Sequence, residues 1–149
     1  MTARQKQMVR ETFEAIRDEA GPVATLFYGR LFELEPDLRR MFPREIERQG
    51  LKLMEMLAAV VEHLDRLETL NPVLQAMGQR HAGYGVVERH YEIVDRALIW
   101  SLSQALDGGL DAEHKVAWHE VITYVATAMM EGANGPARDE RMAGGPDST

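Results

Sequence analysis

His81 is the residue whose type and position best suit it to chemistry. It ends an apolar-periodic segment that begins at Leu74, and a stretch broken by Gly83 and Gly85 follows it. A single imidazole at the end of a helix suits one axial bond to iron in a large flat macrocycle, because the macrocycle supplies the other four ligands. The alternative is an ordinary core or surface histidine, which is the commoner role for a lone histidine on an apolar face.

The other motifs that could carry chemistry are incomplete. His119-Glu120 begins like a zinc-protease motif, but Thr123 stands where the second histidine is needed. His63, His90 and His114 also lack a partner at metal-ligand spacing. The sequence contains no glycine-rich phosphate loop and no serine nucleophile motif. With no cysteine in the chain, neither a disulfide framework nor a thiolate metal site can form.

The elements that must position His81 are expected to be helices. Apolar residues recur at helical spacing, and no stretch alternates convincingly with a period of two. Thr2 and Asp111 are expected to cap the first and last helices, and Gly21-Pro22 is expected to end the first. The apolar stripes run through residues 2–20, 23–34, 36–42, 53–64, 72–81, 91–106 and 111–129. The pattern predicts an all-α chain of about seven or eight helices.

Length and composition predict one globular domain over residues 1–131. The chain has 149 residues, of which 45% are hydrophobic, enough for a real core. Residues 132–149 hold four of the twelve glycines and two of the six prolines, so they are expected to form a flexible tail. The net charge of −7 argues against binding nucleic acid or an anionic membrane. Without a signal-like or membrane-spanning apolar run, the expected location is cytoplasmic.

A distinctive combination of residues recurs at fixed spacings along the chain. Its segments are Leu26–Pro36, Leu38–Pro43, Gln49–Met54, Arg80–Val86, His90–Val94 and Ala117-Trp118. This combination resembles the globin domains of bacterial flavohaemoglobins and their single-domain relatives. The resemblance covers roughly residues 5 to 131, and the combination is highly specific, although no single position would be. It implies a globin fold packed around one b-type haem, since no cysteine is available for a thioether.

The resemblance implies roles for residues on both sides of the haem. His81 is the implied axial ligand of the iron, and Tyr28 and Gln49 are the implied donors to a bound gas. Phe42 and Leu53 are the implied haem contacts beside them. Each has an alternative: Phe42 and Leu53 as ordinary core, Tyr28 as a helix-flank residue whose hydroxyl reaches water, and Gln49 as part of a solvated helix start.

The resemblance is weaker for the groups that would hold the His81 ring in place. Tyr91 matches the family's tyrosine, but its glutamate would fall at Ala133, and Glu131 would reach the site only if the helix were distorted. Ile122 stands where the family has a further tyrosine. An incomplete network would donate less charge to iron, which argues against peroxide-like chemistry.

Four other positions complete the implied cofactor contacts. Val86 and Val94 lie in the matching segments and are expected to contact the haem. Lys52 and Arg80 are candidates for pairing with haem propionates, although exposed helix cations are commonly just solvated.

The resemblance therefore implies a haem globin that reversibly binds dioxygen and other diatomic gases, including carbon monoxide and nitric oxide. One alternative is a nitric oxide dioxygenase that forms nitrate and depends on a separate reductase, because the resemblance covers no flavin or nicotinamide domain. A gas sensor and a helical interaction domain without cofactor are two further hypotheses. The oligomeric state stays open at this point.

Overall fold

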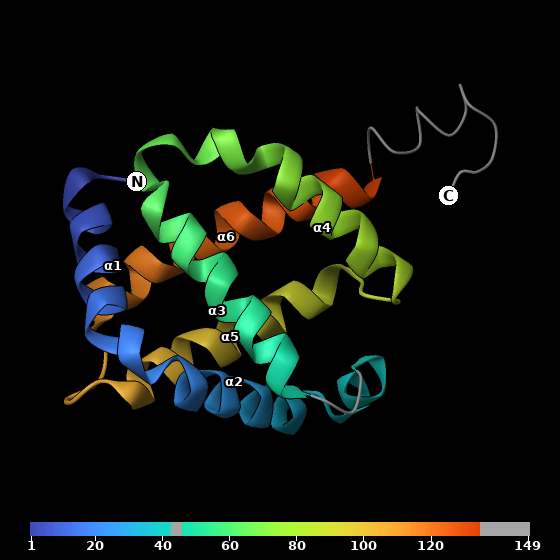
Figure 1. Cartoon of the computed structure of the whole chain (residues 1–149), viewed down its shortest axis with the longest axis horizontal. Coiled ribbons are helices and arrows are strands. Elements are labelled where there is room, and N and C mark those ends of the chain that lie inside the picture. Colours follow the sequence, from blue (N-terminus) through green and yellow to red (C-terminus); the bar gives the residue numbers. More distant parts are fainter. Residues whose placement is uncertain (43–45, 135–149) are drawn as a thin grey trace.

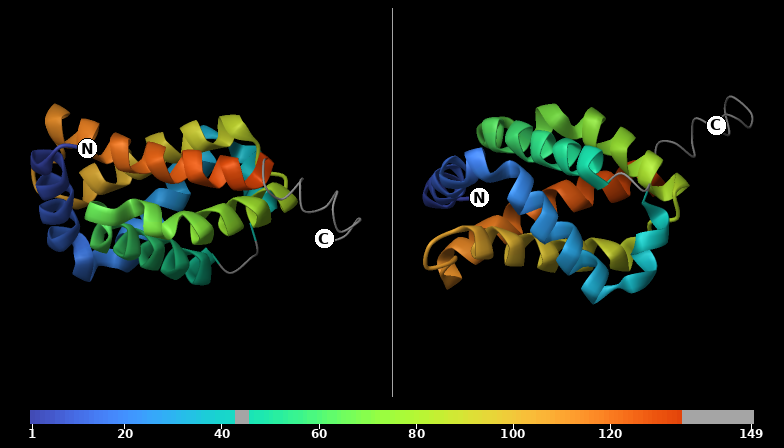
Figure 2. Two further views of the ribbon diagram at one scale, coloured as in Figure 1. Left: turned by 90° about the horizontal axis from the view of Figure 1, so that it is seen from above. Right: turned by 60° about the horizontal axis from the view of Figure 1, so that its bottom comes forward.

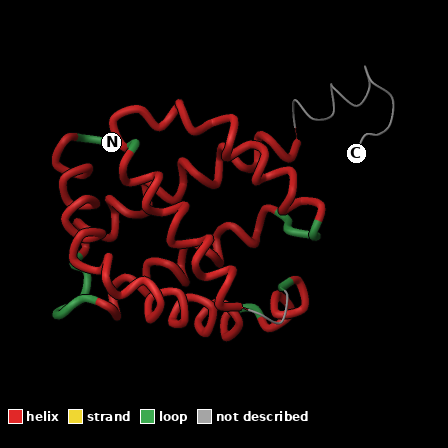
Figure 3. The backbone as a smooth tube through the Cα atoms, in the orientation of Figure 1, coloured by secondary structure: helices red, strands yellow, loops and turns green. Residues whose placement is uncertain are grey.

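The computed structural model describes residues 1–42 and 46–134. These ranges contain six α-helices, three 3-10 helices and no strand. Figure 1 and Figure 3 show how the helices are arranged. The α-helices are α1 (Ala3–Ile16), α2 (Ala20–Leu34), α3 (Ile46–Glu62), α4 (Asn71–Gly83), α5 (Glu88–Ala105) and α6 (Ala112–Asn134). The 3-10 helices are η1 (Arg17–Glu19), η2 (Pro36–Met41) and η3 (Leu64–Leu70). The prediction of an all-α chain is confirmed.

Local side-chain chemistry begins the first and last helices where the sequence predicts. The Thr2 hydroxyl accepts a hydrogen bond from the Gln5 N–H at 3.0 Å, and the Gln5 side chain accepts one from the Thr2 N–H at 2.9 Å. This capping box satisfies two donors that have no partner inside α1. Asp111 likewise accepts the His114 N–H at 2.9 Å at the start of α6.

Two predicted boundaries differ from the structure. The prediction that Gly21-Pro22 ends the first helix is wrong, because α1 ends at Ile16 and α2 already begins at Ala20. Pro22 fits inside α2 because a first-turn N–H has no intrahelical acceptor to lose. At the other end, α6 continues to Asn134 and so includes the first three residues of the predicted tail, 132–134. Residues 135–149 of that tail lie outside the described residues.

The helices enclose one apolar core. α4 packs most extensively on α6, while α2 packs on both α5 and α3 (Figure 2). The largest completely buried side chains come from all six α-helices, and they include Trp118, Ile16, Leu31, Leu57, Leu74 and Leu102. None of the helices within the described ranges has the length and apolar character needed to cross a bilayer.

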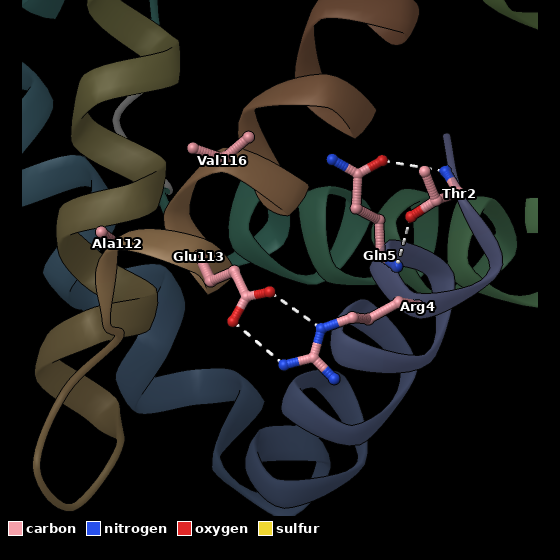
Figure 4. A pocket seen from close by; sticks show the side chains of 6 residues that line it. All are labelled: Thr2, Arg4, Gln5, Ala112, Glu113 and Val116. Atoms are coloured by element: carbon pink, nitrogen blue, oxygen red, sulfur yellow. Dashed lines mark hydrogen bonds and ion pairs between the residues drawn. The ribbon is translucent and has the colours of Figure 1, made fainter.

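A surface hollow lies where the start of α1 meets the start of α6 (Figure 4). Arg4 and Glu113 form a bidentate ion pair there, with N–O distances of 2.8 and 3.0 Å. Both side chains are exposed, so solvent screens the pair and it contributes little to stability. The hollow lies between two helix ends, and its lining residues do not form a catalytic site.

The contact between α4 and α6 requires two glycines. A Cβ added at Gly78 would overlap the Met129 carbonyl, and one added at Gly132 would overlap the Gln75 backbone. The two helices therefore approach backbone to backbone at these positions. This approach sets the direction of α4 and hence the position of its last turn.

Replacing Gly78 by alanine is expected to destabilise the protein. The new methyl group must push α4 away from the α6 backbone, and overpacking of this kind costs about 2 kcal/mol or more. Gly29→Ala is the matched control, because Gly29 is also helical but has nothing within 4 Å of an added Cβ. The control should gain about 0.5–1 kcal/mol from helix propensity. Denaturant unfolding measures both, and equal effects would contradict the close approach.

Candidate functional site

His81 lies in the last turn of α4 and is half-buried. Its Nδ1 atom is 2.8 Å from the backbone carbonyl oxygen of Met77, one helical turn earlier. A carbonyl oxygen can only accept, so Nδ1 must carry the hydrogen in this bond. The neutral ring therefore presents an unprotonated Nε2 with its lone pair free. This is the tautomer that a metal-ligating histidine needs, with its other nitrogen held by an acceptor.

His81 does not belong to a metal site built from several side chains. Nowhere in residues 1–42 and 46–134 do three His, Asp or Glu side chains converge to hold a metal ion. The imidazole has the exposed Tyr84 ring as an aromatic neighbour, with centroids 6.4 Å apart. The geometry accordingly suits one bond to a metal whose other ligands come from elsewhere.

Tyr28 is a buried tyrosine on α2, 7% exposed, inside an aromatic cluster. Its ring meets Phe27 and Phe42 edge-on, with centroids 4.9 and 5.4 Å apart, and lies 6.1 Å from Phe32. Burial raises the pKa of Tyr28 to about 12. Its hydroxyl makes no hydrogen bond to any described residue. At neutral pH this position holds a protonated donor whose ring is fixed and whose hydroxyl is available.

Phe42 follows η2 and joins the same aromatic cluster. Its ring is half-buried, 5.4 Å from Tyr28 and 5.5 Å from Phe32 by centroids, both nearly edge-on. The ordinary-core interpretation of Phe42 thus holds in part, and its remaining exposed area is available to a flat ligand beside Tyr28. Pro43, the next residue of the predicted motif, lies outside the described residues.

α3 carries Gln49 and Leu53 one turn apart, as their spacing predicts. Both side chains are half-buried, beside the fully buried face formed by Gly50, Met54 and Leu57. A Cβ at Gly50 would lie 2.8 Å from the Ala24 Cβ and 3.9 Å from a Tyr28 ring carbon, so α3 crosses α2 closely there. The crossing brings the helix of Gln49 beside Tyr28. Gln49 has no hydrogen-bond partner within the described ranges.

The residues expected near His81 from α5 and the preceding connection are also half-buried. They are Val86, Tyr91 and Val94. Burial raises the pKa of Tyr91, so its hydroxyl is protonated at neutral pH. Its hydroxyl has no hydrogen bond in the described part of the chain, where the acceptor for His81 Nδ1 is the Met77 carbonyl.

The structure also places the residues where the family resemblance weakens. α6 is helical without interruption to Asn134, and Glu131 on it is exposed. Ala133 is half-buried and Ile122 is buried, so neither family position carries a polar side chain. The group that holds the His81 ring is consequently a backbone carbonyl and not a carboxylate. Lys52 and Arg80 are exposed and have no ion pair with any described residue.

The remaining histidines have structural partners. His63 repeats the contact of His81, with its Nδ1 2.8 Å from the Ala59 carbonyl. His119 Nδ1 lies 2.6 Å from Asp95, and His114 Nδ1 lies 2.8 Å from Asp111. His90 is buried and accepts the Val87 N–H at 3.0 Å. The sequence did not predict this last role, although a histidine at the third helical position can take the place of the glutamate of a capping box.

Comparisons with known proteins identify the family to which the chain is similar. A family model described as Globin matches residues 25–129. Neuroglobin-1 of Oncorhynchus mykiss is 30% identical over 146 residues, which cover 89% of this chain and 92% of that protein. A flavohemoprotein of Halalkalibacterium halodurans is 25% identical, and the alignment covers 85% of this chain but 31% of that protein.

The fold comparison points the same way. A solved bacterial globin from Campylobacter jejuni has a TM-score of 0.81 at 20% identity, and the match covers 92% of this chain and 99% of that one. The relatives include both neuroglobins and flavohemoproteins, so the comparisons support the family as a whole and not one type within it. The expected globin fold is confirmed. The chain belongs to the globin family, whose members are haem proteins that bind diatomic gases.

Proposed function

We propose that this globin reversibly binds dioxygen at one b-type haem held by His81. The observation that carries the proposal is the bond from His81 Nδ1 to the Met77 carbonyl, which leaves Nε2 free for one axial bond. Haem iron in its ferrous state supplies the centre at which diatomic gases bind reversibly. The half-buried apolar residues around His81 and Tyr28 fit such a group, because a flat hydrophobic cofactor would complete their burial.

Tyr28 is the principal donor in this proposal. Dioxygen bound in a haem protein carries partial negative charge, so a nearby O–H group stabilises it. The Tyr28 ring is immobilised by three other aromatic rings, and its pKa of about 12 keeps the donor proton at neutral pH. Gln49 is the second donor, and its helix crosses α2 beside Tyr28 at Gly50.

Other residues would hold the cofactor by packing and by charge. Phe42 and Leu53 would contact it on the Tyr28 side, and Val86, Tyr91 and Val94 on the His81 side. Lys52 and Arg80 are exposed cations free to pair with its propionates. The neutral carbonyl behind His81 donates less charge to the imidazole than a carboxylate would, which favours reversible binding over peroxide chemistry.

A nitric oxide dioxygenase is the second candidate function. The flavohemoprotein relatives support it, since the name indicates a flavin in addition to the haem. In this second candidate function a reductase would be the electron donor. Dioxygen and nitric oxide would combine to nitrate in the space beside Tyr28.

The first expected result concerns the axial ligand. Replacing His81 by glycine should abolish the five-coordinate ferrous haem spectrum, and added imidazole should restore it by occupying the vacated space. His63→Gly is the control, because His63 makes the same ring-to-carbonyl contact directly after the end of α3. Acidified organic solvent should extract the haem from the unaltered protein, as the chain has no cysteine to retain it. An unchanged ferrous spectrum in His81→Gly would exclude His81 as the ligand.

The second expected result concerns the donor. Tyr28→Phe removes one hydrogen bond to a partly charged acceptor, which contributes roughly 1.5–3 kcal/mol. Dioxygen dissociation should therefore accelerate about 10-fold or more, while carbon monoxide dissociation changes far less. Gln49→Leu should have a smaller effect on dioxygen.

Tyr124→Phe is the matched control for Tyr28→Phe. The Tyr124 hydroxyl donates to Asn71 at 2.8 Å between α6 and α4, away from the aromatic cluster. Its loss should lower stability by about 1 kcal/mol without altering dioxygen dissociation. If Tyr28→Phe changed both gases equally, its effect would be steric, and the donor role would fail.

The third expected result separates binding from catalysis. Mixed with nitric oxide in stopped flow, the dioxygen-equilibrated protein should form one nitrate per haem rapidly. Sustained turnover should require an added flavin reductase, since this sequence contains no glycine-rich nucleotide motif. Continued nitrate formation from nicotinamide alone would contradict this requirement. Failure of the single turnover would exclude the dioxygenase and leave gas binding or sensing as the function.

A further inference from the structure

The start of α5 is closed by a histidine ring. The residue before the helix, Val87, has no polar side chain with which to cap it. Instead the Nδ1 atom of His90 accepts the Val87 N–H at 3.0 Å, and the His90 N–H donates to the Val87 carbonyl at 3.0 Å. The bond from the Val87 N–H to the His90 ring is one half of a capping box, with histidine in place of glutamate or glutamine, and the Val87 carbonyl replaces the missing N-cap side chain as the acceptor of the His90 N–H. His90 is 5% exposed, so its ring lies within the fold.

Residues 84–87 connect α4 to α5, and at the α4 end this connection is hydrogen-bonded to His81. The His81 carbonyl accepts hydrogen bonds from the Tyr84 and Val86 N–H groups, each at 3.0 Å. Between them Gly85 adopts a φ of +100°, which a residue with a side chain rarely adopts. Two successive N–H groups therefore join the two histidines. The Val86 N–H donates to the His81 carbonyl, and the Val87 N–H donates to the His90 ring.

An ion pair fixes the α5 end of this connection to the rest of the fold. Arg89 and Glu35 are 3.0 Å apart, and the Glu35 side chain is only 19% exposed. Glu35 directly follows α2, the helix of Tyr28, so the start of α5 is anchored to the end of that helix. The ion pair therefore holds the start of α5 in place. Any shift of the connection would also move the last turn of α4, to which it is hydrogen-bonded.

We infer that His90 is a positioning residue for His81, holding the connection between α4 and α5 in the form that fixes the last turn of α4. This inference rests on the proposed role of His81 as axial ligand. Without the His90 acceptor, the Val87 N–H loses its partner, and the adjoining Val86 N–H is no longer held on the His81 carbonyl. The imidazole of His81 then samples several orientations instead of one.

The charge state of His90 gives the inference a signature that a purely structural role lacks. Burial, and then the Arg89 charge, lower the pKa of His90 below its ordinary value of 6.5, while Glu35 opposes the shift. Nδ1 accepts only when it is unprotonated. The cap is therefore complete above pH 6.5 and is lost as the pH falls through the lowered pKa of His90.

The test compares His90→Gln with His90→Leu in the haem-loaded protein. Glutamine retains an acceptor that suits this capping position, whereas leucine fills the space without one. Amide hydrogen exchange at Val87 should be roughly 5-fold faster or more in His90→Leu and near the original rate in His90→Gln. The iron–histidine stretching band of the ferrous protein should broaden or shift in His90→Leu only. On acidification the band of the original protein should change, while that of His90→Gln should not change over the same range.

Asp111→Ala is the matched control. It removes the cap at the start of α6, whose printed hydrogen bonds are to His114 and not to the α4–α5 connection, and should cost similar stability while leaving the iron–histidine band unchanged. The inference is overturned if His90→Leu leaves that band unchanged, or if Asp111→Ala alters it equally. A protein with no histidine-ligated haem would instead refute the proposed function. The Val87 exchange rates would then still decide whether His90 holds the connection.

Discussion

The direct packing of α4 on the α6 backbone is the constraint on which the rest of the site depends. Gly78 and Gly132 remove the side chains that would otherwise separate the two helices. The direction of α4 is therefore fixed where its middle meets the α6 backbone, and that direction decides the position of His81 in its last turn. A ligand histidine is useful only if it is placed this narrowly.

His81 and Tyr28, the two groups proposed to act on the cofactor and the gas, are preorganised in the fold. His81 has its tautomer set by a carbonyl one turn away, and Tyr28 has its proton retained by burial and its ring held by other aromatic rings. They come from α4 and α2, helices that are not neighbours in the chain. Preorganised groups need little rearrangement on binding, so more of each interaction is available for affinity and selectivity.

Membership in the globin family does not decide the function of this chain, because proteins of one fold can have several different functions. The features of this chain that support the proposed gas binding are the buried, protonated Tyr28, Gln49 on the helix that crosses beside it and the carbonyl that accepts from His81. Glu131 is exposed on an uninterrupted helix, so it does not provide the carboxylate found in flavohaemoglobins. These features favour reversible gas binding over oxidative chemistry.

The sequence by itself determined the helices, their caps and the residue types able to carry chemistry. Thr2 and Asp111 could be identified because capping depends on residues within one turn, and helical periodicity is likewise local. The end of α1 at Ile16 was not predicted, because Pro22 is acceptable in a first turn as well as after a helix. Only the tertiary structure showed the backbone contact of α4 with α6, the carbonyl behind His81 and the ring of His90 on Val87. These depend on how backbone atoms and side-chain rotamers meet in three dimensions, which residue type and spacing leave undecided.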